Sequence, residues 1–192
     1  MSRGGYFGIF LLMALENVIP PIPSEVILGI AGVLVARGEL SYWPLVAIAT
    51  LGTTAGNCFW YWIGHKFGYE RLAPFIARHG RWFTVTFEEV EKSAEFFNRH
   101  GHWVIFFLRF SPILRTIVSL PAGLSHMPLG KFLTFTFAGS LIWNALLVQG
   151  GRWLAPLIER YEGTASLIIV GSVALMLAYY LYRVATWKPR ED

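Results

Sequence analysis

The chain has 192 residues, of which 55% are hydrophobic and 15% charged, with a formal net charge of +4. The charged fraction is well below the roughly 25% usual in soluble domains, and the mean hydropathy is positive at +0.49. These values exclude an ordinary soluble protein, and a basic patch for nucleic acid is not expected because the basic residues flank apolar runs. We therefore predict an all-α polytopic membrane protein, with residues 1–192 forming one integral membrane domain.

Residues 1–64 are predicted to form a broken hairpin followed by a span. Gly4–Leu15 and Val26–Ala36 carry no charge, but each run is shorter than the ~20 residues that a spanning helix needs. The segment between them contains Pro20, Pro21 and Pro23. Two short arms around this break indicate a re-entrant hairpin, with Ser24 suited to cap the second arm. The alternative is one long kinked span from Gly4 to Ala36. A signal peptide is not expected, because no small-residue cleavage site follows the first run.

Tyr42–Ile63 is an uncharged stretch long enough to span the membrane. Gly52, Gly56, Gly64 and Gly68 recur in it, or just after it, at multiples of four residues. This small-xxx-small spacing lets helix backbones approach closely. We expect these glycines to serve packing rather than chemistry.

Residues 65–102 are the polar stretch of the chain, predicted to be a cytoplasmic amphipathic segment. Thr86 and Glu89 have the spacing of a capping box at a helix start. His79, His100 and His102 lack the matched cysteine or carboxylate spacing of a metal site. No metal and no cofactor are therefore expected.

Residues 103–151 are predicted to form a second hairpin plus span. The apolar stretch Trp103–Gly123 carries Arg109 and Arg115, although one arginine at bilayer depth costs about 2.5–3.5 kcal/mol on the insertion scale. In an unbroken helix these side chains would point about 240° apart. Pro112 and Pro121 interrupt the stretch, and a break at Pro112 would let both guanidiniums face one place. A C-terminal transmembrane helix is expected at 163–184.

The topology follows from three crossings, at Tyr42–Ile63, Phe132–Gly151 and the C-terminal helix. Ten basic residues then collect on the side of the polar stretch and the C-terminus, against four on the other side. The positive-inside rule places the first side in the cytoplasm. The two hairpin-plus-span segments would be inverted relative to each other, as in many secondary transporters.

Four ionisable residues lie in or beside the hairpins: Glu16, Glu25, Arg109 and Arg115. If the hairpin tips meet, two carboxylates and two guanidiniums balance, which lowers the cost of burying them. Arginine forks match phosphate oxygens, and a carboxylate in such a place can exchange protons near neutral pH. An anion or proton site is thus predicted, with a purely architectural ion-pair cluster as the alternative. No nucleophile stands with a histidine and an acid, so an enzyme is not expected.

The sequence resembles the DedA family of membrane proteins, related to the VTT-domain proteins. The resemblance rests on E-N-x-x-P-P-I-P-S-E at Glu16–Glu25, on the glycine and tyrosine pattern from Gly52 to Gly68 and on F-L-R-F-S-P-I-L-R at Phe107–Arg115. It also rests on P-A-G-x-x-x-M from Pro121, followed by Phe132, Gly139 and Trp143.

The resemblance implies two re-entrant hairpins that face each other from opposite leaflets, and a role in moving lipids across the bacterial inner membrane. It implies that Glu16, Glu25, Arg109 and Arg115 are functionally important. We predict that the two arginines bind the substrate phosphate and that the two glutamates couple transport to protons. The residues expected to form breaks and packing contacts are Pro20, Pro21, Pro23, Ser24, Gly52, Gly56, Tyr61, Gly64, Pro112, Pro121, Gly123, Gly139 and Trp143.

The function predicted from all of this is proton-coupled translocation of undecaprenyl phosphate. The alternatives are a phosphatidylethanolamine scramblase or flippase, and a lipid-binding scaffold that transports nothing. The expected partners are a polyprenyl phosphate or phospholipid, protons and membrane lipids. The apolar surfaces are compatible with a monomer or a homodimer.

Overall fold

A computed structural model describes residues 2–18, 24–83, 103–111, 115, 118–160 and isolated positions between 171 and 186. Every regular element among these residues is an α-helix, which confirms the predicted all-α class. Some predictions fall outside the described residues. These are the breaks at Pro20, Pro21, Pro23 and Pro112, the amphipathic segment from residue 84 onward and most of the C-terminal helix.

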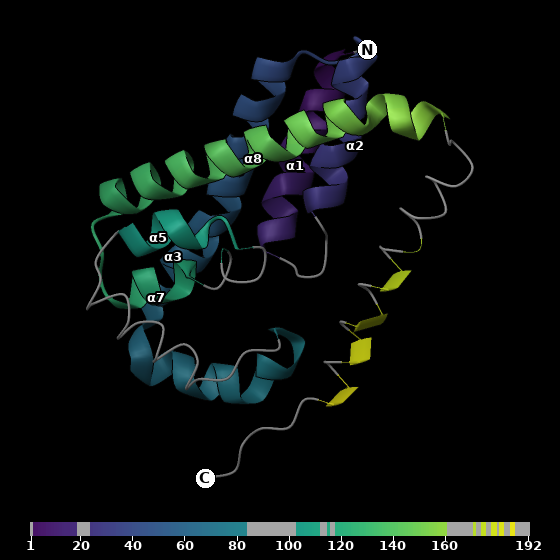
Figure 1. Ribbon diagram of the computed structural model, residues 1–192. Coiled ribbons are helices and arrows are strands. Elements are labelled where there is room, and N and C mark those ends of the chain that lie inside the picture. Colours follow the sequence, from purple (N-terminus) through teal and green to yellow (C-terminus); the bar gives the residue numbers. More distant parts are fainter. Residues whose placement is uncertain are drawn as a thin grey trace. The chain divides into compact units, whose positions relative to one another are not determined.

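The helices vary widely in length (Figure 1). The short ones are α1 (Ser2–Val18), α2 (Ser24–Ala36), α5 (Trp103–Leu108) and α7 (Ser119–Leu124), and the long ones are α3 (Tyr42–Phe83) and α8 (Leu129–Arg160). By length and composition, Leu129–Ile158 is the one described helical segment that could cross a membrane. It is longer than the predicted span Phe132–Gly151, because Lys131 and Arg152 lie within the helix without ending it.

Helix α3 continues past the predicted span and is kinked at Gly68, where φ is 62° and ψ is −179°. A glycine adopts this backbone conformation readily, whereas a side chain would strain it. No described atom lies within 4 Å of the position that a Cβ on Gly68 would take. The residue therefore serves the kink and not the close packing expected from its spacing.

The chain divides into two compact units, which we describe separately. Unit 1 comprises Met1–Gly56 and Ser140–Tyr179. It contains α1 and α2, which lie side by side (Figure 1), the first part of α3 and the second part of α8. Its apolar core includes Met13, Leu28, Leu45 and Val148. A Cβ on Gly52 would lie 2.5 Å from the carbonyl oxygen of Phe10, so α1 and α3 are in backbone contact there.

Unit 2 comprises Asn57–Gly139 and Tyr180–Asp192. Its core is built from Tyr61 of α3, Ile105 of α5, Ala122 of α7 and Phe132 of α8, with their buried neighbours. A Cβ on Gly123 would lie 2.8 Å from the amide nitrogen of His65. Helices α3 and α7 are therefore packed backbone to backbone.

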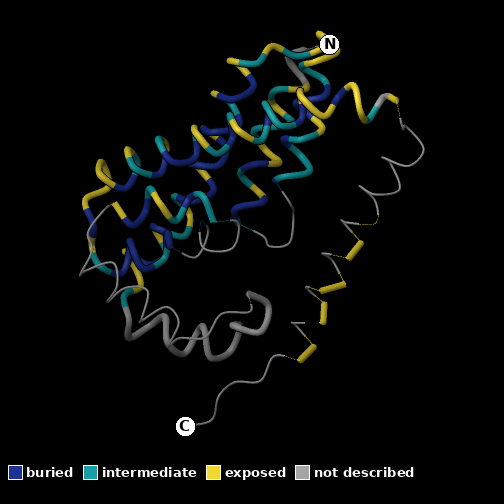
Figure 2. Tube along the Cα trace, in the orientation of Figure 1, coloured by how far each residue is buried: buried dark blue, intermediate teal, exposed yellow. Residues whose placement is uncertain are grey.

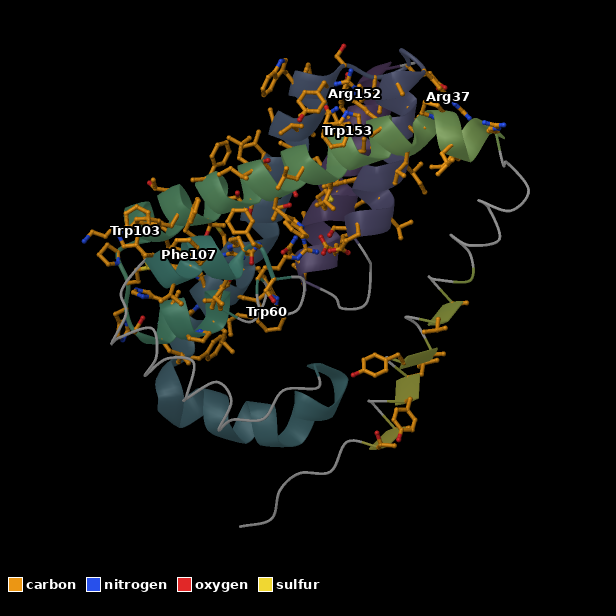
Figure 3. The ribbon with its side chains drawn as sticks, in the orientation of Figure 1. Arg37, Trp60, Trp103, Phe107, Arg152 and Trp153 are labelled. Carbon is orange, nitrogen blue, oxygen red and sulfur yellow. The ribbon has the colours of Figure 1, made fainter. Side chains whose placement is uncertain are left out.

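Exposed residues lie along both units (Figure 2), and many of them are large and apolar. Trp103 and Phe107 on α5 are 59% and 65% exposed, and Trp153 on α8 is 76% exposed (Figure 3). Soluble monomers rarely expose apolar surface on this scale. The surface is that expected of a protein surrounded by lipid.

Candidate functional site

Arg109 forms the centre of a buried polar cluster in unit 2. It follows α5 directly, and only 1% of its surface is exposed. One terminal nitrogen donates to Asn57 Oδ1 at 2.6 Å and to the backbone carbonyl of Arg115. The other donates to Ser119 Oγ at 3.1 Å and to Thr136 Oγ1 at 2.9 Å. All four terminal N–H groups are thus used within the protein.

Three of the four acceptors of this cluster come from three further helices. Asn57 belongs to α3, Ser119 to the first turn of α7, and Thr136 to α8. Ser119 also donates its hydroxyl hydrogen to Asn57 Oδ1 at 2.7 Å. The Arg109 guanidinium therefore joins every described helix of unit 2 at one point.

The packing around Arg109 leaves no room for a larger neighbour. A Cβ on Gly139 of α8 would lie 2.9 Å from Arg109 Cβ and 3.0 Å from the carbonyl oxygen of Phe106. The guanidinium carbon lies 5.9 Å from the centre of the Phe132 ring, within the range of a cation–π contact. Gly139 therefore allows the arginine stem to pass between α5 and α8.

The cluster satisfies the terminal N–H groups of Arg109 but not its charge. Each acceptor in it is a neutral oxygen, and no carboxylate among the described residues accepts from this guanidinium. The Nε–H group is buried and has no acceptor in the described part of the chain. A positive charge held in this way favours an anion nearby, because the surroundings screen it weakly.

Arg115, the second predicted arginine, is also buried, with 5% of its surface exposed. Its backbone amide donates to the carbonyl of Ser111 at 3.1 Å, and its own carbonyl accepts from Arg109. The structure thus brings the two arginines together, and Arg109 holds the backbone from which the Arg115 side chain extends.

The two predicted acidic residues lie in unit 1. Glu16, near the end of α1, is 6% exposed, and its Oε2 accepts from Asn17 Nδ2 at 3.1 Å. The same amide nitrogen donates to the carbonyl of Met13 at 2.9 Å, which fixes the Asn17 side chain. Glu25 is half-buried in the first turn of α2, where a negative charge is favoured by the helix dipole.

Other residues predicted to form breaks or packing contacts occupy varied surroundings. Tyr61 is buried and donates its hydroxyl hydrogen to the carbonyl of Met127. Pro121 is buried within α7, Ser24 is the buried first residue of α2, and Trp143 of α8 is half-buried. A Cβ on Gly56 would lie 2.7 Å from Asn17 Cβ, and one on Gly64 would lie 3.0 Å from the amide nitrogen of Leu124.

Sequence reasoning missed Asn57, Ser119, Thr136 and Asn17. All four are neutral, so no charge in an apolar segment marks them. A usable signal existed for Asn57, because an amide in an uncharged span must find a hydrogen-bond partner. Ser119 and Thr136 had no such signal, since hydroxyls on membrane helices commonly bond to their own helix backbone.

Comparison with known proteins identifies the family. The VTT domain matches residues 22–153, which include the Arg109 cluster and both arginines. The chain belongs to the VTT-domain (DedA) family. It is therefore a membrane protein of a family that contains transporters.

Several curated relatives align with this chain over most of both sequences. An alkaline phosphatase-like protein of Lactococcus lactis is 34% identical over 95% of this chain and 88% of its own length. Undecaprenyl phosphate transporter A of Staphylococcus aureus is 38% identical over 81% of this chain and 76% of its own length. The Bacillus subtilis protein of the same name is 30% identical over 97% and 92%. No solved structure matches the chain.

Proposed function

We propose that this chain is a lipid translocase that moves undecaprenyl phosphate across the bacterial inner membrane. The observation that carries the proposal is the buried pair Arg109 and Arg115, in which Arg109 meets only neutral acceptors among the described residues. Such a pair suits an anion on a lipid headgroup. The relatives named undecaprenyl phosphate transporter A support the choice of lipid.

The two arginines have different roles in this proposal. All four terminal N–H groups of Arg109 are engaged within the protein, so Arg109 supplies positive charge and holds the backbone of Arg115. The side chain of Arg115 is the direct ligand of the phosphate. This assignment refines the sequence-based prediction, in which both arginines bind the phosphate.

Glu16 and Glu25 are proposed to couple transport to protons. Glu16 is buried against Asn17, whose amide donates to one carboxylate oxygen. A carboxylate in such surroundings changes its proton affinity when a nearby charge arrives or leaves. Proton uptake at Glu16 and Glu25 would then accompany the movement of the phosphate.

The lengths of the helices support the predicted hairpins. Helices α1 and α2 have 17 and 13 residues, and α5 and α7 have 6 each, all below the ~20 needed to cross a bilayer. We propose that α1 with α2, and α5 with α7, are the arms of re-entrant hairpins. The three crossings and a cytoplasmic C-terminus complete this proposed topology.

Headgroup translocation in sealed proteoliposomes tests the proposal. Undecaprenyl phosphate is compared with phosphatidylethanolamine, with and without a pH gradient, for the native protein and for Glu16→Gln. We expect transport of the prenyl phosphate that the gradient accelerates and that Glu16→Gln uncouples from it. Equal movement of both lipids without a gradient would indicate a scramblase, and movement of neither lipid would indicate a scaffold.

The same vesicles test the activity suggested by the name of the Lactococcus relative. Release of inorganic phosphate from undecaprenyl phosphate is measured in parallel. We expect no release above that of empty vesicles, because the proposed roles of Arg109 and Arg115 are binding and positioning. Release that depends on Arg115 would assign a phosphatase instead.

A further inference from the structure

A histidine pair in unit 2 lies outside the proposed phosphate site. His65 is on α3, three residues before the Gly68 kink, and His126 is in the turn between α7 and α8. Their Nδ1 atoms are 3.2 Å apart, and both residues are exposed. No local spacing in the sequence connects residues 65 and 126, unlike His100 and His102, which lie two residues apart.

We propose that His65 and His126 form a binding site for a divalent transition-metal ion such as Zn²⁺, Ni²⁺ or Cu²⁺. Two nitrogens that each bind a metal at 2.0–2.1 Å in tetrahedral geometry are about 3.3 Å apart. The observed separation of 3.2 Å fits this geometry with little movement of either ring. Imidazole nitrogen selects these ions over Mg²⁺ and Ca²⁺, which prefer oxygen ligands.

The backbone on both sides of the pair is held by close packing. A Cβ on Gly123 would lie 2.8 Å from the amide nitrogen of His65, and one on Gly64 would lie 3.0 Å from the amide nitrogen of Leu124. Helices α3 and α7 therefore approach as closely as glycines allow. This contact brings His65 next to the turn that carries His126.

The ring of His65 is supported by Tyr61, one turn earlier on α3. The two rings are stacked, with centroids 5.8 Å apart and planes 11° from parallel. Tyr61 is itself fixed, because its hydroxyl donates to the carbonyl of Met127 and its ring stacks on Phe132 at 4.5 Å. One ligand of the proposed site is thus oriented before the metal arrives.

His126 has a backbone conformation that a side chain adopts at some cost. Its φ is 50°, and no other non-glycine residue in the described part of the chain has a positive φ. Glycine is the usual choice at such a turn, although histidine is among the residues enriched there. An imidazole at this position, aimed at another imidazole, is consistent with a ligand role.

The protein supplies two ligands, and the ion keeps open positions. Among the described residues no group of three or more His, Cys, Asp or Glu side chains could hold a metal. Water or an exogenous anion would complete the coordination, as in other open sites. The ion would join the end of the α3 span to the α7–α8 turn, which predicts that binding stabilises the protein.

Calorimetric titration of the tag-free protein in nanodiscs with NiCl₂ and ZnCl₂ tests the site. We expect one ion per chain and a higher melting temperature when the ion is bound. His65→Ala and His126→Gly should each weaken binding at least tenfold, and His126→Gly also relieves the positive-φ conformation, so its loss of binding cannot be attributed to misfolding. Lys66→Ala removes the exposed neighbour of His65 without removing a ligand and should bind as tightly as the native protein.

Copper electron paramagnetic resonance gives a second readout. The native protein should show Cu²⁺ coupled to two imidazole nitrogens, and each single variant should show one. The proposal is overturned if the native protein binds none of these ions, or if both histidine variants bind them as tightly as the native protein does.

Discussion

Two buried polar clusters, one in each unit, use the same pair of long helices in different ways. In unit 2, Arg109 donates four hydrogen bonds, including those to Asn57 of α3 and Thr136 of α8. In unit 1, Asn144 of α8 donates to Thr50 and Thr53 of α3 at 3.3 and 3.5 Å. Its Oδ1 has no partner in the described part of the chain, and neither has Ser140 Oγ nearby on α8.

The difference shows what a buried charge requires that a buried amide does not. Asn144 is fully buried, yet its hydrogen bonds are longer than the usual 2.7–3.2 Å. A neutral group can tolerate this at a cost of about 1–3 kcal/mol. A buried arginine requires better partners than this, and the side-chain acceptors of Arg109 lie 2.6–3.1 Å from its terminal nitrogens. We therefore expect substitutions in unit 2 to have the larger effects.

Arg109→Met removes the centre of the tighter cluster and should have the largest effect on stability. Thr136 Oγ1 and the Arg115 carbonyl would each lose the guanidinium N–H group that donates to them. Leaving a buried acceptor without a donor costs about 1–3 kcal/mol for each group. We expect a total loss of about 2–6 kcal/mol, measured by SDS or guanidinium unfolding in micelles. Arg152→Met, which removes an exposed arginine on α8, is the matched control and should change stability by less than about 1 kcal/mol. Equal effects of the two variants would contradict the account of unit 2.

Gly139→Ala disturbs the packing around the same Arg109 cluster. The new methyl group would lie within 3.0 Å of Arg109 Cβ and the Phe106 carbonyl. We expect a loss of about 1–3 kcal/mol from overpacking. Gly150→Ala lies on the same helix, and no described atom would contact its methyl group, so that variant should gain about 0.5–1 kcal/mol. The two melting temperatures should shift in opposite directions.

Asn144→Leu changes the polar cluster of unit 1 and should have the smallest effect on stability. It removes two long hydrogen bonds together with an acceptor that has no partner in the described residues. Thr50 keeps its own bond to the Val46 carbonyl at 2.7 Å. We expect a change within about 1 kcal/mol in either direction, because an apolar replacement of a poorly satisfied polar group is often nearly neutral. A loss as large as that of Arg109→Met would show that the unit 1 cluster is satisfied in a way the distances do not indicate.

The sequence was sufficient to predict where the buried charges lie. Arginine and glutamate are so costly in an apolar segment that position alone selects Arg109, Arg115 and Glu16, and the structure buries all three. The all-α class followed from the apolar runs and their lengths in the same way. These predictions rest on large energies that local sequence reveals.

Other features depend on contacts that no local pattern contains. The partners of Arg109 come from residues as much as 52 positions away, and the two histidines are 61 positions apart. The full extents of the two long helices were not predicted: α3 continues to Phe83 and α8 runs from Leu129 to Arg160, because charged residues lie inside these helices without ending them. Gly68 has the spacing of a packing glycine, yet its backbone conformation assigns it to a kink.

In the proposed mechanism, Arg109 positions the site and Arg115 binds the phosphate. The most direct test is the rate of undecaprenyl phosphate translocation by Arg115→Gln in proteoliposomes, with unfolding measured on the same preparation. In variant protein that remains folded, we predict a rate at least tenfold lower, partly restored in Arg115→Lys because lysine retains the charge but not the fork. A native rate in a correctly folded Arg115→Gln variant would contradict the claim.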